Sequence, residues 1–253
     1  MTRVSSTRTT LLEWLLLGFA DIVKLIRDDK RTAEQLQPLK DAIQAVIDGR
    51  SVQVVFTETI KDLCLSSDPA KIRQGWQQLY QQWQLSLEIP EVPYGTKRIQ
   101  VEKKRGRILI FVWETLADKA GLPTLGRLFP KMNSWATKAD SGITVDSVLS
   151  GWMFVKSSLD APDRNTTEAG LRDAFTKQNA TGLTLNAYII FGQFCREVFG
   201  SYPDIKTWSR LLGSSYGGDL VSARFNSDGF LRVDPRLSPE DAYDRVGGRS
   251  AAV

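Results

Sequence analysis

Apolar residues recur every three or four positions along most of the chain, as they do on one face of an α-helix. Several of these segments begin at a Thr or Asp cap or end at a glycine. The predicted helices cover residues 10–28, 32–48, 70–87, 125–139, 145–159, 167–177 and 183–199. The last of them is strongly apolar, so we expect it to be buried in the core. The pattern therefore predicts a mainly α protein.

Two short β elements are predicted besides these helices. The first is a small β-hairpin near residues 97–112, with its turn at Arg105-Gly106. The second joins the runs LVSARF and FLRV through NSDG, whose Asn, Asp and Gly tolerate positive φ. A helix from Ile205, capped by Asp204, is predicted before it. With residues 183–199 this gives a helix-turn-helix followed by a wing-like β-hairpin, an order found in nucleic-acid readers and in hairpins that only close a core.

The segment IPEVPYG, with Pro90, Pro93 and Gly95, is the clearest break in the pattern. It separates a predicted N-terminal helical subdomain, residues 1–90, from a basic, winged-helix-like subdomain, residues 91–246. Residues 247–253 are predicted to form a flexible tail. One continuous domain is the alternative, because 253 residues suit one large domain as well as two small ones.

The chain has no histidine and two cysteines, Cys64 and Cys195. The usual Ser-His-Asp and Cys-His catalytic sites and zinc sites that use imidazole are therefore excluded. The phosphate-binding loop and the dinucleotide-binding glycine pattern are absent as well. We accordingly expect no enzyme activity, no cofactor and no metal. Whether Cys64 and Cys195 pair is left open by the sequence.

Positive charge is concentrated in one part of a mildly basic chain, whose net charge is +4 and whose pI is about 9.0. Between Lys97 and Lys138 there are ten basic and three acidic residues, a difference of +7, so the rest of the chain carries −3. Such asymmetry is typical of a face that binds a polyanion, although a solvated basic surface is the plainer interpretation. The predicted phosphate-binding residues are Lys97, Arg98, Lys103, Lys104, Arg105 and Arg107 in a basic strip, and Lys206, Arg210, Arg224 and Arg232 in a secondary contact.

These observations favour a non-enzymatic nucleic-acid-binding protein, nucleoprotein-like or winged-helix-like, that contacts the phosphate backbone of RNA or DNA. The alternative is a self-assembling structural protein, such as a coat, matrix or scaffold subunit, whose homo-oligomer interface is the N-terminal helical hairpin. A third hypothesis is a carboxylate–metal nuclease, because Glu102-Lys103-Lys104 matches half of such a site. An acidic protein or a membrane surface is a further possible partner of the basic strip.

The first residues raise the question of targeting. They are basic and rich in Ser and Thr, as in a transit peptide, but the apolar run that follows contains Glu13 and stops at Asp21. That run is too short to cross a bilayer, so no transmembrane segment is predicted. With two cysteines and no recognisable secretion signal, we expect a cytoplasmic or other reducing compartment.

Overall fold

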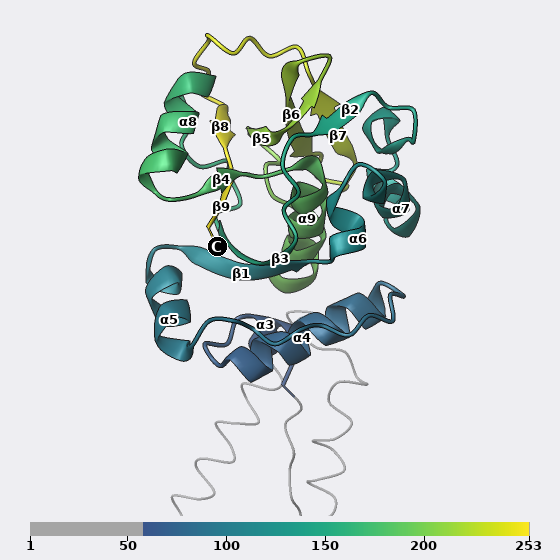
Figure 1. The fold of residues 1–253 in the computed structure, drawn as a ribbon, viewed down its shortest axis with the longest axis vertical. Coiled ribbons are helices and arrows are strands. Elements are labelled where there is room, and N and C mark those ends of the chain that lie inside the picture. Colours follow the sequence, from purple (N-terminus) through teal and green to yellow (C-terminus); the bar gives the residue numbers. More distant parts are fainter. Residues whose placement is uncertain (1–57, 253) are drawn as a thin grey trace, which may run out of the picture. The chain divides into compact units, whose positions relative to one another are not determined.

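The computed structural model describes residues 58–252, which form a mixed α/β fold with two sheets, one of them a half-barrel (Figure 1). The prediction of a mainly α protein is therefore wrong. The helices predicted over residues 10–28 and 32–48 lie outside the described residues.

The helices of the described part are short, apart from two. They are α3 (Ile60–Cys64), α4 (Pro69–Gln82), α5 (Thr96–Lys104), α6 (Glu114–Ala117), α7 (Gly121–Leu128), α8 (Glu168–Lys177) and α9 (Leu185–Phe199), with 3₁₀ turns η1 (Pro130–Met132) and η2 (Trp135–Thr137). The strands are β1 (Arg107–Val112), β2 (Ile143–Val145), β3 (Gly151–Lys156), β4 (Thr181–Gly182), β5 (Trp208–Tyr216), β6 (Asp219–Phe225), β7 (Leu231–Asp234), β8 (Val246–Gly248) and β9 (Ser250–Ala252).

The first sheet is antiparallel, with strand order β1-β3-β9-β4. Every residue of β1 is buried, and Ile110 pairs with Met153 in the middle of β3. Strands buried on both faces read as continuous apolar runs rather than as alternating ones. RILIFV and WMFV fit that description.

The second sheet has the order β2-β5-β6-β7 and is built around the long strand β5. One edge of β5 pairs with β6, through a tight turn at Gly217-Gly218 in which both glycines have positive φ. Its other edge carries β2 near the end of the strand and β8, in parallel, near its start at Trp208. This parallel pairing sets the chain just before β8 against the start of β5.

Helix α9 is the centre of the core, and Figure 1 shows it between β1 and the strands of the second sheet. On one side Phe194 stacks on Trp76 of α4, and on the other Tyr188 stacks on Phe225 of β6. The helix predicted over residues 183–199 is thus confirmed, with Thr184 as its N-terminal cap and Gly200, in the left-handed conformation, at its end. Side chains before and after Pro90 therefore share one hydrophobic core.

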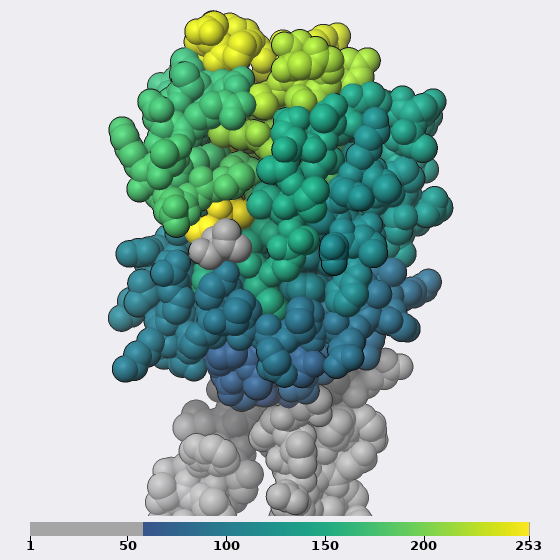
Figure 2. All heavy atoms as spheres, viewed as in Figure 1, coloured from purple at the N-terminus to yellow at the C-terminus, as the bar shows by residue number. Residues whose placement is uncertain are grey.

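The end of the chain links the two sheets. Strand β8 belongs to the second sheet and β9 to the first, and the residue between them, Arg249, is fully buried. Only a small part of the segment shows at the surface between α8 and β1 in Figure 2. The stretch predicted to be a flexible tail, residues 247–253, thus contains a buried strand and most of another.

Several predicted elements have another form. The segment from residue 97, expected to be the first strand of a hairpin, is helix α5. Its two buried residues, Ile99 and Glu102, are three positions apart, which is the spacing of one helix face. The helix expected over residues 145–159 is replaced by the end of β2 and by β3, and the one over 125–139 stops at Leu128 and continues as 3₁₀ turns. The predicted helix from Ile205 is strand β5, so there is no helix-turn-helix among residues 58–252, whereas the wing-like hairpin exists as β6–β7.

Candidate anion-binding site

Three pockets adjoin one another on the described part of the chain, and we call them together the basic groove. The Arg224 pocket, of about 450 Å³, is lined by Asp160, Arg164, Ile205, Lys206, Thr207, Arg224 and Arg245. The Lys156 pocket, of about 530 Å³, shares Asp160 and Arg164 with it. The Lys177 pocket, of about 380 Å³, shares Arg105 and Lys156 with the Lys156 pocket. The shared residues make the three pockets neighbours.

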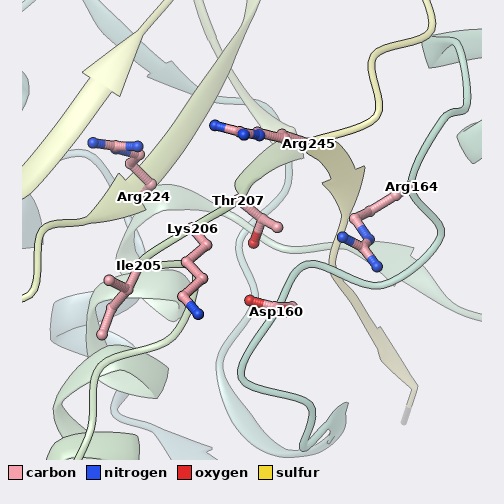
Figure 3. Close-up of a pocket in the computed structure, with 7 residues that line it drawn as sticks. All are labelled: Asp160, Arg164, Ile205, Lys206, Thr207, Arg224 and Arg245. Atoms are coloured by element: carbon pink, nitrogen blue, oxygen red, sulfur yellow. The ribbon is translucent and has the colours of Figure 1, made fainter.

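The walls of the Arg224 pocket come from segments far apart in sequence (Figure 3). Lys206 and Thr207 precede β5, Arg224 lies on β6, Arg245 precedes β8, and Asp160 and Arg164 belong to the loop after β3. In the view of Figure 3, Arg224 and Arg245 lie along the top of the pocket, Arg164 to the right, and Lys206 and Asp160 below.

Backbone hydrogen bonds fix these segments together. The Trp208 amide donates to the Arg245 carbonyl at 2.7 Å, which places Arg245 beside the start of β5. The Gly248 amide donates to the Pro162 carbonyl at 2.9 Å. A side chain at Gly247 would collide with that same carbonyl, so glycine permits the close approach of β8 to the loop that carries Arg164. The pairing of β8 with β5 thus brings Arg245 and the Arg164 loop to the same pocket.

Arg224 has no acidic partner among residues 58–252. Its guanidinium carbon lies 5.2 Å from the centre of the Trp208 ring, a cation–π contact that fixes the side chain. Its Nε is buried and has no hydrogen-bond partner in the described part of the chain. Arg232 stands directly opposite it on β7, and like charges in such cross-strand pairs destabilise a sheet. An anion beside these guanidinium groups would offset the repulsion between them.

The charges of the Arg224 pocket are uncompensated, whereas those further along the groove are mostly paired. Among residues 58–252, no ion pair involves any of the four cations in its lining, Arg164, Lys206, Arg224 and Arg245, and Asp160 is the one acid there, which leaves +3. In the Lys156 pocket, by contrast, the Lys156 Nζ lies 3.0 Å from an Asp163 carboxylate oxygen.

Half of the predicted basic strip is ion-paired with one buried acid. Glu102 of α5 is fully buried, and its carboxylate lies 3.0 Å from nitrogens of both Arg105 and Arg107 and 3.4 Å from Arg98. Lys103 donates to the Leu65 carbonyl at the end of α3. Arg105 and Arg107 do line the groove, but both are ion-paired with Glu102, and the Arg107–Glu102 pair joins β1 to α5.

The remaining predicted residues divide between the groove and the interior. Lys97 and Lys104 are exposed on α5 and line none of the three pockets. Arg210, 1% exposed, donates to the carbonyls of Thr166, Ser238 and Asp241 and is therefore structural. Lys206 and Arg224 line the Arg224 pocket, and Arg232 is exposed on the neighbouring strand.

Sequence reasoning missed Arg164, Arg245, Lys156 and Lys177. Arg164 lies in DAPDRN and Arg245 in YDRVGG, where adjacent aspartates cancel the local charge count. The signal that distinguishes them is three-dimensional, because the pairing of β8 with β5 brings both arginines to one place.

Next to the Arg224 pocket lies a closed polar cluster around Asp204. Arg249 donates to its two carboxylate oxygens at 2.8 and 3.0 Å, and the hydroxyls of Ser209, Tyr188 and Thr207 donate at 2.7, 2.9 and 3.0 Å. Asp204 and Arg249 are fully buried. Burial raises the pKa of the Tyr188 hydroxyl well above its usual value. This cluster is an internal anchor with every charge matched, and it offers no free group to a ligand.

The described residues also bear on the catalytic alternatives. Among them no group of three or more metal-ligating side chains is gathered in one place. Glu102, the carboxylate of the predicted nuclease half-site, is on a helix and occupied by arginines. Cys64 and Cys195 are free and buried, and burial raises the pKa of the Cys64 thiol to about 12, so it is not a ready nucleophile.

Comparison of the chain with protein-family models, with curated proteins and with solved structures found no match. No helix within residues 58–252 is long and apolar enough to span a membrane.

Proposed function

We propose that this protein binds nucleic acid through the sugar–phosphate backbone, with the basic groove as the contact surface. The observation that carries the proposal is the ring of four cations without ion-pair partners within the described residues, in a pocket that continues into two others. Lysine and arginine near phosphates release condensed counterions, and this term dominates the affinity of sequence-independent binding.

The shape of the groove favours a chain-like anion over a single small one. Each of the three pockets falls within the roughly 300–1,000 Å³ typical of ligand sites, and each shares lining residues with the next. Phe230, 48% exposed, lies two residues from Arg232 at the start of β7 and is available to stack on a base. Both features suit a single strand whose phosphates follow the groove. RNA and DNA present the same phosphates, so the proposal covers either.

The test is a comparison of two double variants with the same change in charge. Arg224→Gln/Arg245→Gln removes two groove cations, and Lys119→Gln/Lys138→Gln removes two exposed cations that line none of the three groove pockets. Fluorescence anisotropy with a labelled single-stranded oligonucleotide is measured at several salt concentrations. We expect the groove variant to bind all sequences more weakly and to reduce the slope of log K against log salt by about 1 for each lost phosphate contact.

The control variant should keep both the affinity and the slope of the unmodified protein. Equal weakening by the two variants would mean that net charge alone attracts the strand, and the groove would lose its role. An unmodified protein that shows no salt-dependent binding would overturn the proposal.

Self-assembly is the second candidate function, and one surface feature favours it. Trp135 and Tyr216 are 39% and 42% exposed and lie edge to face, with ring centres 5.4 Å apart. Exposed aromatic pairs of this kind are enriched at protein interfaces. Light scattering over a range of concentrations, without nucleic acid, tests it: growing particles that Trp135→Ser/Tyr216→Ser abolishes would support a homo-oligomer, and a constant monomer mass would exclude it.

We also propose a reducing compartment, such as the cytoplasm. Two free, buried thiols support it, since cysteines of proteins in oxidising compartments are commonly paired. Fractionation of cells that express the tagged chain checks this, and recovery in an oxidising compartment would contradict it.

A further inference from the structure

The positive charge of the basic groove is unequally distributed. The Arg224 pocket has four cations against one carboxylate, a net +3, and no ion pair within the described residues engages its cations. The Lys156 pocket has Arg105, Lys156 and Arg164 against Asp160 and Asp163, a net +1, and its Lys156 is paired. The Lys177 pocket is lined by four cations and no acid, but Arg105 and Arg107 pair with Glu102 and Lys156 pairs with Asp163, so Lys177 is its one cation without an ion pair among the described residues. The Arg224 end of the groove therefore has the most unpaired positive charge.

The Arg224 pocket is also terminal within the groove. It shares lining residues with the Lys156 pocket and none with the Lys177 pocket. A phosphodiester inside a strand needs room for the chain to continue on both sides. A phosphate at the end of a strand needs an exit on one side only, and the Arg224 pocket adjoins the Lys156 pocket on the side of Asp160 and Arg164.

The side chains of the Arg224 pocket suit a doubly charged phosphate. Arg224 is fixed against Trp208, so its guanidinium fork is held in place before a ligand arrives. Guanidinium groups bind phosphate oxygens in pairs of hydrogen bonds, and Arg245 and Arg164 come from two other walls of the same pocket. A phosphodiester carries one negative charge, while a phosphomonoester carries about 1.5 to 2 at pH 7 because its second pKa is about 6.

We propose that the Arg224 pocket recognises a phosphomonoester, namely the terminal phosphate of the strand that occupies the rest of the groove. This inference rests on the proposed nucleic-acid binding and names the part of the ligand that the pocket selects. The Lys156 and Lys177 pockets contact the internal phosphodiesters of the same strand.

Three oligonucleotides of one sequence test the inference: one with a 5′-phosphate, one with a 3′-phosphate and one with hydroxyls at both ends. We expect one phosphorylated strand to bind the unmodified protein at least about tenfold more tightly than the hydroxyl strand, as the additional charge-assisted hydrogen bonds require. Arg224→Gln/Arg245→Gln should bring that ratio close to one. Lys177→Gln, in the pocket at the other end of the groove, should weaken all three strands alike and keep the ratio.

A second readout follows from the charge of the ligand. Below about pH 6 the terminal phosphate takes up its second proton, so the preference should shrink on acidification, whereas binding of the hydroxyl strand should not show that change. Arg245→Gln alone, at an exposed residue before β8, keeps the test usable if the double variant does not fold.

The outcomes separate this inference from the proposed function. Equal, salt-dependent binding of all three strands would overturn the terminal-phosphate inference and leave nucleic-acid binding in place. Absence of binding for all three would overturn both. A preference that survives Arg224→Gln/Arg245→Gln would assign the terminal phosphate to another place and would also refute the inference.

Discussion

The Asp204 cluster and the Arg224 pocket lie side by side and share Thr207. The arginine of the cluster is ion-paired, whereas those of the pocket are not, among residues 58–252. In the cluster, Arg249 is fully buried and meets a carboxylate that also accepts three hydroxyl hydrogen bonds. In the pocket, Arg224 and Arg245 make no ion pair with any described residue. The number of basic residues is thus a poor guide to a binding site, and the presence or absence of their counter-charges is a better one.

The difference follows from what water does at each place. A buried guanidinium loses its hydration, so it must find hydrogen-bond acceptors and an opposite charge inside the protein. The cations of the Arg224 pocket line an open cavity where water and salt screen them. They are therefore tolerated without partners, at the cost of some mutual repulsion, and remain available to an anion.

The largest effect is expected from breaking the closed cluster. Asp204→Ala leaves Arg249 buried without its counter-charge and removes the acceptor of Tyr188, Ser209 and Thr207. We expect a loss of about 3–5 kcal/mol in the free energy of unfolding, the range measured when one partner of a buried pair is removed. Urea unfolding followed by tryptophan fluorescence measures it.

The matched control for that experiment is Asp204→Ala combined with Arg249→Met, which removes both charges. It should be less destabilised than the sum of the two single variants, because contacting residues couple by about 0.5–3 kcal/mol. Additive effects of the two substitutions would mean that Asp204 and Arg249 contribute independently, which contradicts the anchor role.

A smaller effect is expected at Arg210, which the charge pattern placed in the secondary contact. Its guanidinium donates to three carbonyls, of Thr166, Ser238 and Asp241, and so holds two loops to β5. Arg210→Ala should cost about 2–3 kcal/mol of stability, since each hydrogen bond to a charged group contributes about 1.5–3 kcal/mol and water replaces part of the loss.

The control for Arg210 is Arg236→Ala, whose side chain is 86% exposed and pairs with Asp234 at the surface. Exposed pairs contribute about 0–1 kcal/mol, so its unfolding curve should barely move. If Arg210→Ala is fully stable but binds nucleic acid more weakly, Arg210 is a binding residue and not a structural one.

Local signals in the sequence predicted the elements whose patterns agree with their tertiary surroundings. Helix α9 is apolar, capped by Thr184 and ended by Gly200, and the hairpin β6–β7 follows from its turn residues. Strand β5 was mistaken for a helix because Ser209, Arg210 and Ser214 are polar yet buried. Their hydrogen-bond partners lie elsewhere in the chain, such as the Leu185 amide that donates to the Ser214 hydroxyl. The local sequence pattern therefore could not show that these polar residues are buried.

Charge asymmetry predicted a polyanion-binding face, and that stays a prediction. Of the residues predicted for it, Arg105, Arg107, Lys206 and Arg224 line the groove. The sequence could not show that Glu102 is buried and contacts three arginines of the strip. Nor could it show that the last strands run through the core and bring Arg245 to β5, because strand pairing between distant segments leaves no local trace.

Alkaline pH should lower the free energy of unfolding, because two cysteines are buried as thiols. Burial raises the pKa of Cys64 from 9.0 to about 12 and also raises that of Cys195, so the native state keeps protons that the unfolded state releases. The free energy of unfolding should be constant below about pH 9 and fall as pH rises above it, by about 1.4 kcal/mol per pH unit for each thiol. Urea unfolding between pH 8 and 10.5 measures the slope.

The double variant Cys64→Ala/Cys195→Ala is the control for the pH dependence, because only the slope matters and not the starting stability. It should show a shallower fall, with the remainder due to buried tyrosines such as Tyr80, whose pKa burial also raises. An unchanged slope would mean that the two thiols titrate alike in the native and unfolded states.

The smallest effect on stability is expected where the effect on binding is expected to be large. Arg224→Gln/Arg245→Gln removes two cations that have no ion-pair partner among residues 58–252, and it relieves the repulsion between Arg224 and Arg232. Loss of the cation–π contact with Trp208 opposes this gain, so the free energy of unfolding should change by no more than about 1 kcal/mol, and the part due to repulsion should fade at high salt because of screening. A loss of several kcal/mol, as at Asp204, would show that the pocket arginines are structural like Arg249. A stable variant with weakened strand binding would instead mean that Arg224 and Arg245 contribute to anion binding and not to the stability of the fold.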